Sequence, residues 1–417
     1  MRAEVIASGD ELASGQRLDT NSQWLSQRLG ELGVPVVLHT TCGDDLTALV
    51  GVLRTAIDRA EVVIATGGLG PTADDLMREA LARAVDRELV LDEAALEQIR
   101  QLFARRRREM PERNRVQAMF PRGSRPIDNP HGTAPGIQVE APRLGRAPAH
   151  VFCLPGVPAE MRSMWQQGVA DRLMQLPGVG QRAVCHHRIK CFGRGESHVE
   201  AQLPDLIRRG RVPSVGITAH QATITLRITA AGATPEAARA AMQPTINLIH
   251  QRLGSLVFGE GNDEMHHAVA KLLLKKSKTL ATVEWGTGGI IAQWLHEVLP
   301  SDGPFRGGVV ARSSSALQTL LGIDQAVSQR HGPVSDEVSR RMAASIRERV
   351  DSDFGLAVSR FPRFQPDAKS PPEWFIALAD RQSVEIVAVP FAGHPDILHV
   401  ASAKRALDLL RLRLLRL

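Results

Sequence analysis

The sequence predicts an α/β fold of three domains: a parallel-sheet domain in residues 1–172, a small α+β domain in 173–254 and a second α/β domain in 255–417. Three observations predict this class. In the first and last parts of the chain, short apolar segments typical of strands alternate with segments typical of amphipathic helices. That alternation changes between about residue 175 and residue 254. Finally, 417 residues exceed what one hydrophobic core usually holds, so roughly two to four domains are expected.

The first domain begins with three strand–helix pairs. The expected strands are AEVIAS (3–8), PVVLHTT (35–41) and EVVIAT (61–66), and the expected helices cover 22–33, 45–60 and 75–85. Because the connections are short, consecutive strands are expected to run parallel, with helices on both faces of the sheet. Ligands of such sheets bind beyond the carboxyl ends of the strands, which is where this sequence places loops rich in Gly and Asp.

The middle domain has a different rhythm, with strands expected at 183–193 and 222–230 and helices at 196–207 and 235–254, the last interrupted or bent at Pro244. GRGES at 193–197 has two interpretations: a nucleic-acid loop of the KH kind, or a turn that opens a helix, which is the simpler one. Cys185 and Cys191 lie near two histidines. Their spacing fits no zinc site, so we expect reduced structural thiols.

The third domain returns to alternating strands and helices. Strands are expected at 279–285, 307–313, 354–360, 374–380 and 384–390, and helices at 263–276, 288–299, 335–350 and 404–417. We expect the leucines of the final helix to pack on the sheet rather than to enter a membrane.

The composition predicts a globular cytoplasmic protein. No apolar run approaches the roughly 18 residues of a membrane span, and the N-terminus lacks the basic and apolar regions of a signal peptide. The net charge of +6 comes mostly from scattered arginines. The dense cluster Arg105–Arg108 suits a solvated helix face, or attraction of anionic nucleotides. Because tyrosine is absent and aromatic residues are 4%, few side chains can stack on bases, and we expect no nucleic-acid partner.

The most specific motif is ATGGLGPTADD at 65–75, directly after an expected strand. Its glycines let backbone amides approach a phosphate without a Cβ in the way, and a threonine adds a hydroxyl. Asp74 and Asp75 follow at the head of a helix, where one of them can act as the cap. Two carboxylates beside a phosphate loop exceed what capping needs, and Mg²⁺ bridging carboxylate and phosphate explains both. The expected phosphate-binding residues are Gly67, Gly68, Gly70 and Thr72.

Other loops at the same expected sheet edge are also acidic or rigid. Asp10 and Glu11 follow the first strand, and Asp44 follows the second. Taken singly, each could simply cap a helix; together they place carboxylates around one edge. NPHGTAPG (129–136) and LPGVPAEM (154–161) are rich in Pro and Gly, which suggests walls of a pocket.

ATGGLGPTADD, NPHGTAPG and LPGVPAEM, in this order, resemble the N-terminal domain of the competence/damage-inducible protein A (CinA) family. That domain is similar to the molybdopterin-binding, MoaB/MogA-like fold. FGRGESHVE at 192–200 resembles the family's KH-like middle domain, and the similarity continues through the CinA C-terminal domain. It therefore covers essentially the whole chain.

The resemblance implies a small-molecule ligand with a pyrophosphate group, of nucleotide or pterin type, and in some members metal-dependent hydrolysis of ADP-ribose. Asp44 and Asp75 match the aspartates that serve the metal and the phosphoryl chemistry in related proteins, so they are the expected catalytic and metal-binding residues. Mg²⁺ is the expected cofactor. A homo-oligomer is also implied. With the loops above, the expected ligand-binding residues are Gly67, Gly68, Gly70, Thr72, Asp10, Glu11, Asn129, Gly132 and Thr133.

The string TVEWGTGG at 282–289 resembles the family's nicotinamide mononucleotide deamidase loop, Glu-Ser-Cys-Thr-Gly-Gly, in which serine is the nucleophile. Trp285 replaces that serine and Gly286 the cysteine, so no nucleophilic oxygen remains there. Arg312 replaces a tyrosine, and the segment Arg360–Phe364 replaces a Gly-Ala-Gly-Pro phosphate loop. We therefore expect a degenerate, inactive site whose open cradle is filled by bulky and cationic side chains.

Three interpretations stay open at this point. The first is a CinA-like protein whose N-terminal domain binds a nucleotide- or pterin-type pyrophosphate and acts as a Mg²⁺-dependent ADP-ribose pyrophosphatase. The second is a non-catalytic ligand-binding or assembly protein that oligomerises through its C-terminal domain. The third is an active nicotinamide mononucleotide deamidase, against which Trp285 argues.

Overall fold

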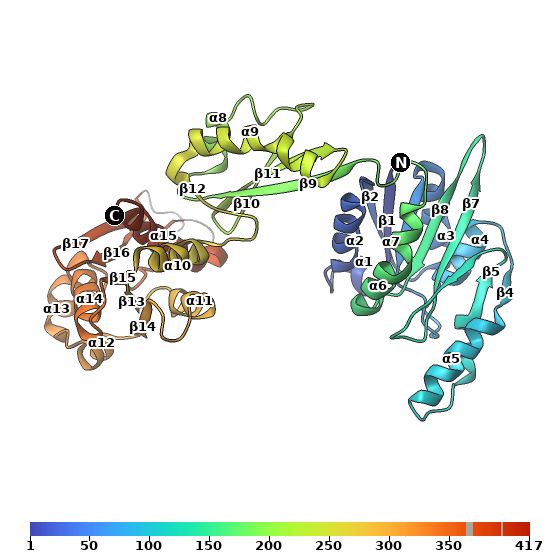
Figure 1. The fold of residues 1–417 in the computed structure, drawn as a ribbon. Coiled ribbons are helices and arrows are strands. Elements are labelled where there is room, and N and C mark those ends of the chain that lie inside the picture. The colour runs from blue at the N-terminus through green and yellow to red at the C-terminus, as the bar shows by residue number, and fades with distance from the viewer. Residues whose placement is uncertain (364–369, 393–394) are drawn as a thin grey trace. The chain divides into compact units, whose positions relative to one another are not determined.

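The computed structural model describes residues 1–363, 370–392 and 395–417 (Figure 1). Phe364, part of the replaced phosphate loop, lies outside these residues. The described chain forms two compact units. The first comprises Met1–Cys185 with Ala230–Ala241, and the second comprises His186–Thr229 with Met242–Leu417. Each unit is described by itself.

A six-stranded sheet forms the centre of the first unit. Its order is β2-β1-β3-β8-β7-β6, with strands at Ala3–Ser8 (β1), Val36–Cys42 (β2), Val62–Thr66 (β3), Arg125–Ile127 (β6), Gly136–Arg143 (β7) and Arg146–Leu154 (β8). β2, β1, β3 and β8 run parallel, whereas β7 is antiparallel to both of its neighbours. The predicted α/β class is confirmed, and the parallel part of the sheet carries the loops of interest.

Helices cover both faces of this sheet, as the short connections require. One face packs on α3 (Leu46–Arg59), α4 (Met77–Ala84) and α5 (Glu93–Arg105), and the other on α2 (Thr20–Glu31), α6 (Pro158–Met164) and α7 (Ala170–Met174). Asp19 and Asp45 cap α2 and α3 by accepting hydrogen bonds from Ser22 N and Ala48 N. The sequence prediction missed α5 and the β7–β8 hairpin. The short elements that complete the unit are α1 (Asp10–Ala13), β4 (Leu89–Leu91), the turn Glu112–Ala118, β5 (Met119–Pro121) and the π-helical turn Trp165–Val169.

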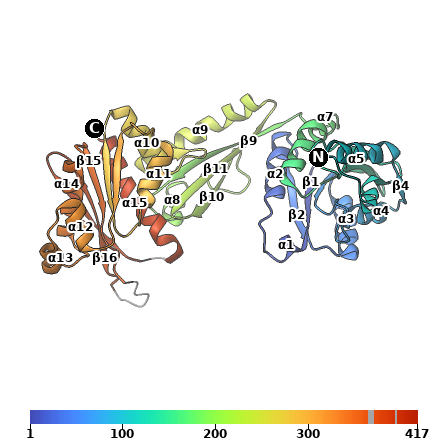
Figure 2. The same cartoon turned by 90° about the horizontal axis from the view of Figure 1, so that it is seen from below.

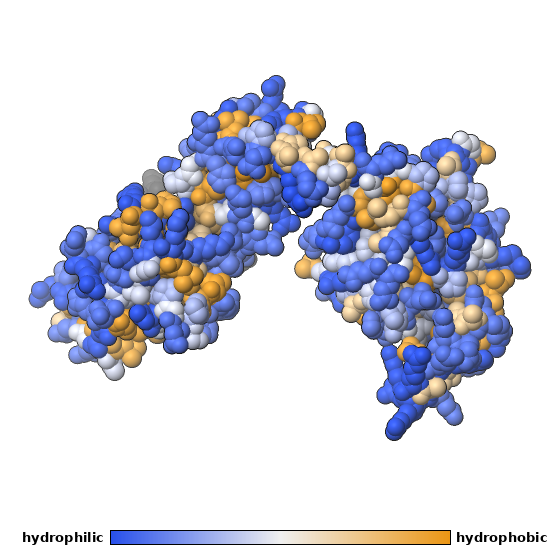
Figure 3. Space-filling view, in the orientation of Figure 1, coloured by the Kyte–Doolittle hydropathy of each residue, from blue (hydrophilic) through white to orange (hydrophobic). Residues whose placement is uncertain are grey.

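The Arg105–Arg108 cluster lies at and beyond the end of α5. All four arginines are exposed, and this part of the surface is hydrophilic on the face in view (Figure 3). Arg106 Nη2 donates to the carbonyl of His131 at 3.0 Å. The cluster thus forms a solvated helix end, one of the two alternatives for this run of charges.

A four-stranded sheet of order β10-β11-β9-β12 consists mostly of residues of the second unit. Its strands are Ala183–Cys191 (β9), Ser214–His220 (β10), Thr223–Gly232 (β11) and Val257–Glu260 (β12), accompanied by α8 (Glu196–Gln202) and α9 (Pro235–Leu253). Of the two expectations at Pro244, an interruption is wrong, because α9 runs through this proline without a break; a bend stays a prediction. GRGES opens α8, as the simpler interpretation predicted. Within this unit Lys190 and Lys404 both pair with Glu264, and Lys404 Nζ also donates to Thr223 Oγ1 at 2.8 Å.

The C-terminal part of the second unit is a five-stranded sheet between two helical layers (Figures 1 and 2). The order is β14-β13-β15-β16-β17, with strands at Leu280–Glu284 (β13), Phe305–Val310 (β14), Phe354–Val358 (β15), Glu373–Ala379 (β16) and Val384–Pro390 (β17). One face packs on α10 (Met265–Lys276), α11 (Ile290–Val298) and α15 (Pro395–Leu415). The other packs on α12 (Ser314–Leu321), α13 (Gln325–His331) and α14 (Asp336–Arg349).

None of the helices that the structure describes is long and apolar enough to cross a membrane. The leucines of α15 pack on the sheet, as predicted: Leu407, Leu410 and Leu414 are buried in the same core as Leu356 of β15. All four cysteines are free thiols, and burial raises the pKa of Cys153 and of Cys191 to about 12.

A buried histidine, His266, predicts that the second unit loses stability in acid. His266 of α10 is 9% exposed, and its ring lies 5.2 Å from that of Trp294 in α11 and 4.4 Å from that of His267. Burial, followed by repulsion from His267, lowers the pKa of His266 to about 4, against attraction from Glu264 and Glu297. The folded state therefore binds fewer protons than the unfolded state between pH 6.5 and about 4.

We expect the free energy of unfolding to fall as the pH drops from 6.5 toward 4, because protonation of His266 favours the unfolded state. The expected total loss is about 3 kcal/mol, at about 1.4 kcal/mol per pKa unit. Urea unfolding at about pH 7 and about pH 4 measures this loss. His266→Phe keeps the ring contact and should remove most of the difference. The exposed His331→Gln should keep the parental pH dependence. Equal acid sensitivity in the parent and His266→Phe would show that different titrating groups cause it.

Candidate functional site

The carboxyl ends of the parallel strands in the first unit surround a cavity of about 480 Å³. Asp44, Asp75 and the glycine loop at 67–70 all line it, together with Glu11 from the loop after β1 and residues 155–158 from the loop after β8. Because parallel strands end at the same sheet edge, loops far apart in the sequence meet here. Asp44 and Asp75, singled out as catalytic, thus share one cavity with the glycines expected to bind phosphate.

The glycine loop passes close to the end of β1. Gly67 has φ +106°, a conformation that side chains other than glycine rarely adopt, and a Cβ at this position would clash with the carbonyl oxygen of Ser8. Its amide donates to Leu154 O at 3.0 Å, which ties the loop to the end of β8. Gly67 is therefore required for the close approach of three strand ends.

Asp44 is held by the loop that follows β1. Its Oδ1 accepts a hydrogen bond from Ser8 Oγ at 3.0 Å, and its Oδ2 accepts one from Asp10 N at 3.2 Å. Asp10 Oδ1 in turn accepts from Asp44 N at 2.9 Å. Asp10 is not among the residues that line the cavity, and its side chain positions Asp44. Its expected role in binding the ligand stays a prediction.

Asp75 closes the glycine loop on itself. Its Oδ2 accepts hydrogen bonds from Thr72 N, at 2.9 Å, and from Thr72 Oγ1. The Thr72 hydroxyl thereby donates to Asp75, and Thr72 is not among the residues that line the cavity. That Thr72 holds a phosphate stays a prediction. The side chain of Asp75 itself faces the cavity.

The NPHGTAPG loop separates into two parts. Asn129 and Gly132 line a neighbouring cavity of about 220 Å³, and Thr133 lines both cavities. The Asn129 amide donates to Ala134 O at 2.9 Å and to Glu160 Oε2 at 2.7 Å. Both of these hydrogen bonds stabilise the conformation of its own loop. Asn129 and Gly132 are therefore not brought to the aspartates, contrary to expectation, whereas Thr133 is.

Further lining residues were not singled out from the sequence. Gln117 carries no local signal. Arg17 and Glu160 were not predicted either. For Glu160 a signal was present, because it is a carboxylate that follows the Pro-Gly turn of LPGVPAEM. The cavity is acidic: one guanidinium, from Arg17, faces carboxylates of Glu11, Asp44, Asp74, Asp75 and Glu160.

The acidic lining has a bearing on Mg²⁺. In the part of the chain that the structure describes, no group of three or more His, Cys, Asp or Glu side chains is arranged to hold a metal ion alone. Mg²⁺ commonly binds through one or two carboxylates plus substrate phosphates and water. Asp44 and Asp75, on one cavity with a loop suited to phosphate, fit that donor set.

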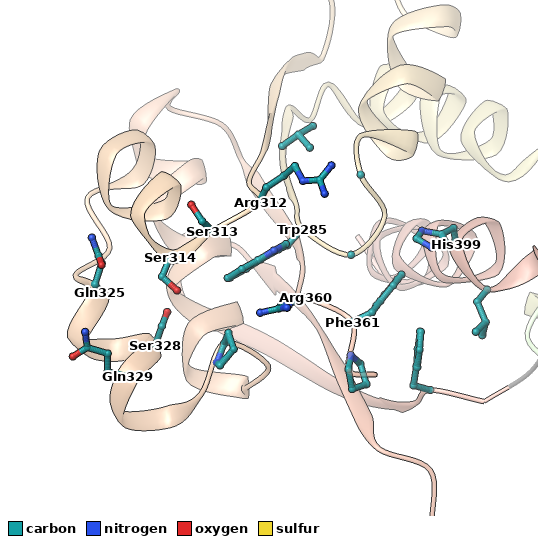
Figure 4. Close-up of a pocket in the computed structure, with 17 residues that line it drawn as sticks. Trp285, Arg312, Ser313, Ser314, Gln325, Ser328, Gln329, Arg360, Phe361 and His399 are labelled. Carbon is teal, nitrogen blue, oxygen red and sulfur yellow. The ribbon is translucent and has the colours of Figure 1, made fainter. Parts of the chain in front are cut away.

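The second unit contains a larger cavity, of about 950 Å³, around the changed deamidase-like string (Figure 4). Trp285, Gly286, Arg312 and Arg360 all line it. Bulky and cationic side chains thus line the cradle, and a space of this volume remains among them in the part of the chain that the structure describes. Phe361 lines the cavity beside Gly286, and its ring also packs against those of Trp374, Phe391 and His399 at centroid distances of 5.2, 5.0 and 5.3 Å.

Gly286 and the segment that carries Phe361 both differ from the family pattern, and they pack against each other. A Cβ at Gly286 would lie 2.6 Å from ring carbons of Phe361 and 2.7 Å from the carbonyl oxygen of Ser359. Gly286 N also donates to Ser359 O at 3.0 Å, which holds the two segments together. Any side chain at position 286 therefore conflicts with the segment that carries Phe361.

Comparison with known proteins gives three consecutive matches to family models. Residues 4–175 match "Probable molybdopterin binding domain", residues 186–259 match "Damage-inducible protein CinA KH domain", and residues 262–414 match "CinA C-terminal domain". Neither the ends of these matches nor those of the two compact units test the expected domain boundaries at residues 172 and 254, which stay predictions.

Full-length relatives agree with these matches. The chain is 34% identical to a CinA-like protein of Dictyoglomus thermophilum over 100% of both chains, and 36% identical to one of Synechococcus sp. over 99% of this chain and 98% of the other. A crystal structure of the protein CinA with unknown function from Thermoplasma acidophilum is 32% identical, covering 41% of this chain and 96% of that one, with a TM-score of 0.37. The chain therefore belongs to the competence/damage-inducible protein A (CinA) family and has a molybdopterin-binding-like first domain.

Proposed function

We propose that the first unit binds a nucleotide- or pterin-type pyrophosphate together with Mg²⁺ and hydrolyses ADP-ribose. The observation that carries this proposal is that Asp44, Asp75 and the glycine loop at 67–70 line one cavity. Its volume of about 480 Å³ lies within the range of roughly 300–1,000 Å³ typical of small-molecule sites.

Charge supports the pairing of metal and diphosphate. Five carboxylates outnumber the one guanidinium that lines the cavity and repel a diphosphate, so a bound cation would favour it; Asp44 and Asp75 are the residues that would hold Mg²⁺ there. The ion, when bound, neutralises charge on the diphosphate and polarises the P–O bond that breaks. The chain itself supplies the amides of Gly68 and Gly70 to bind the phosphate oxygens.

A buried arginine adds positive charge behind the glycine loop. Arg78 is 2% exposed, and its Nη2 donates to Leu69 O at 3.2 Å. Its Nε and Nη1 have no hydrogen-bond partner among the described residues. Burial lowers the pKa of Arg78 to about 10, which still leaves it charged at neutral pH. Its field favours an anion in front of the loop.

The test is release of AMP and ribose 5-phosphate from ADP-ribose by the full-length chain. We expect turnover with Mg²⁺ and none with EDTA. Asp75→Asn should abolish turnover while keeping an acceptor oxygen for Thr72. A parent protein that binds ADP-ribose but does not turn it over would contradict the hydrolase. It would favour a ligand-binding protein without catalysis, with which the lack of a three-ligand metal cluster in the described residues is also consistent.

We further propose that the C-terminal domain has no nicotinamide mononucleotide deamidase activity. An indole at position 285 has no oxygen to attack the substrate, and packing around Phe361 excludes a side chain at 286. Ammonia release from nicotinamide mononucleotide by the full chain, abolished by a change in this cavity such as Arg360→Ala, would disprove this proposal.

A further inference from the structure

The second unit has another cavity, of about 570 Å³, where its four-stranded sheet meets its five-stranded sheet; we call it the junction cavity. The loop after β9 and the β10–β11 turn line one side of it. The start of β16, the end of β17 and α15 line the other, and all of these residues belong to the second unit. Of the described residues, only Leu398 lines both this cavity and the one around Trp285, so the two spaces have different walls.

The buried part of the junction cavity is apolar. Its lining includes two buried aromatic side chains, Phe192 and Trp374, and the buried aliphatic side chains of Ile224, Val389 and Leu398. These side chains come from both sheets and from α15, so the apolar surface surrounds the space rather than covering one side of it. An apolar group that enters such a space leaves water and gains contacts with packed side chains, which favours binding. The cavity is therefore suited to a ligand with a hydrocarbon or aromatic body.

One buried hydroxyl belongs to the same wall. Ser402 of α15 is only 4% exposed and lines the junction cavity. Its hydroxyl forms no hydrogen bond among the residues that the structure describes. Because buried polar groups are normally paired with protein, water or a ligand, this hydroxyl indicates that the occupant also carries a polar group. A purely hydrocarbon ligand would leave it without a partner.

Positive charge is in excess at the opening of the junction cavity. Arg194, from the loop after β9, and Arg405, from α15, both line it and are exposed. Neither forms an ion pair in the described part of the chain, and Asp408, which follows Arg405 on α15, pairs with Arg411 instead. Glu196 is the one carboxylate among the described lining residues. Two guanidinium groups against one carboxylate leave room for a ligand with a single negative charge.

The β10–β11 turn forms a fixed wall of the junction cavity. Gln221 and Ala222 line the cavity and have φ +46° and +61°. A two-residue hairpin turn needs positive φ at both positions, which favours Asn-Gly, so Gln-Ala holds it at a cost. Lys404 Nζ donates to Gln221 O at 3.2 Å and to Thr223 Oγ1 at 2.8 Å, which ties the turn to α15. Strained backbone held by such contacts is typical of ligand sites, and a fixed wall lowers the entropic cost of binding.

We propose that the junction cavity binds a small apolar carboxylic acid. The carboxylate lies near Arg194 and Arg405, and the hydrocarbon or aromatic body lies against Trp374 and the aliphatic side chains beside it. The volume of about 570 Å³ is within the range of roughly 300–1,000 Å³ typical of small-molecule sites. The proposal concerns a site apart from the proposed hydrolase and does not depend on it.

The experiment titrates the full-length chain with octanoate by calorimetry. Octanol and acetate should each bind at least about tenfold more weakly, because octanol lacks the charge and acetate lacks most of the apolar body. Arg194→Ala and Arg405→Ala should each weaken octanoate binding by about tenfold, the lower end for a charge-assisted contact, because both arginines are exposed. Ala401→Phe places a ring in the cavity and should abolish binding, while the melting temperature shows that the variant is folded.

Two further variants serve as controls. Arg209→Ala removes an exposed arginine that lines neither cavity and should leave octanoate affinity unchanged. Arg360→Ala changes the cavity around Trp285 and should also leave it unchanged. Undetectable binding of octanoate at millimolar concentration, equal affinity for octanol, or affinity that survives replacement of both Arg194 and Arg405 would overturn the proposal. Binding lost only in Arg360→Ala would assign octanoate to the other cavity and overturn it equally.

Discussion

Replacement of Asp44 by asparagine is expected to lower Mg²⁺-dependent ADP-ribose hydrolysis by at least about 100-fold, because loss of a metal-site residue costs at least as much as loss of the groups that support one. Asparagine keeps an oxygen that can accept the hydrogen bond from Ser8 Oγ, so the loop around it should stay folded. The negative charge is removed, and an amide group replaces the oxygen that accepts from Asp10 N. Initial rates over a range of Mg²⁺ concentrations measure the effect, and partial rescue at high Mg²⁺ is expected.

Asp45 provides the matched control for this prediction. It is the next residue in the chain, but it caps α3 through Ala48 N at 2.7 Å and does not line the cavity. Asparagine is also a good N-cap, so Asp45→Asn should retain parental activity and stability. Equal rates for the parent and Asp44→Asn would contradict the assigned role of Asp44.

Replacement of Glu284 by alanine is expected to lower the free energy of unfolding of the second unit by about 3–5 kcal/mol. Glu284 is 1% exposed and accepts hydrogen bonds from Thr287 Oγ1 at 2.6 Å and from the backbone amides of Gly289, Ile291 and Ala292 at 3.1, 3.0 and 2.7 Å. Alanine leaves these donors without a partner at the buried start of α11. Buried donors without partners carry their full desolvation cost.

Urea unfolding at neutral pH measures this effect. Glu284→Gln should lie between alanine and the parent, because it keeps one acceptor oxygen but turns an amide donor toward backbone N–H groups. Glu297 is exposed on the same helix, so Glu297→Ala should change stability by no more than about 0.5 kcal/mol. A Glu284→Ala protein as stable as the parent would show that water satisfies these amides.

The role of Glu284 also explains why Glu284 and the segment Thr287–Gly289 still match the family string although residue 285 differs from it. Its four hydrogen bonds hold the Gly-rich loop and the start of α11, and none of them involves the side chain at position 285. The loop geometry is therefore independent of the nucleophile. Trp285 can stand in the cavity while the strand, loop and helix around it keep their arrangement.

Local signals predicted the elements that have strong ones. The first strand was predicted at its observed bounds, because the apolar run Val5–Ala7 lies at its centre and β1 is buried along its whole length. The start of α3 follows from Asp45, whose side chain caps the helix. The short helices α12 and α13 escaped prediction, because segments of eight and seven residues carry little periodicity and are held by packing against α14.

The candidate site divides in the same way. Asp44, Asp75 and the glycine loop could be assigned to one edge because parallel topology brings strand ends together. The commitment of Thr72 to Asp75 and of Asn129 to Glu160 could not be assigned from the sequence. Each is a choice among nearby hydrogen-bond partners, and such choices depend on distances that only the folded chain sets.

By itself, the sequence determined the α/β class, the family and the chemistry of the loops, because apolar periodicity, glycine positions and carboxylates are local properties of the chain. The tertiary structure alone decided that Asp10 supports Asp44, that Arg78 is buried behind the glycine loop, and that a cavity remains beside Trp285. These outcomes depend on which side chains from distant segments pack together. The packing of Phe361 between Gly286 and Trp374, at the wall of this cavity, is one such choice.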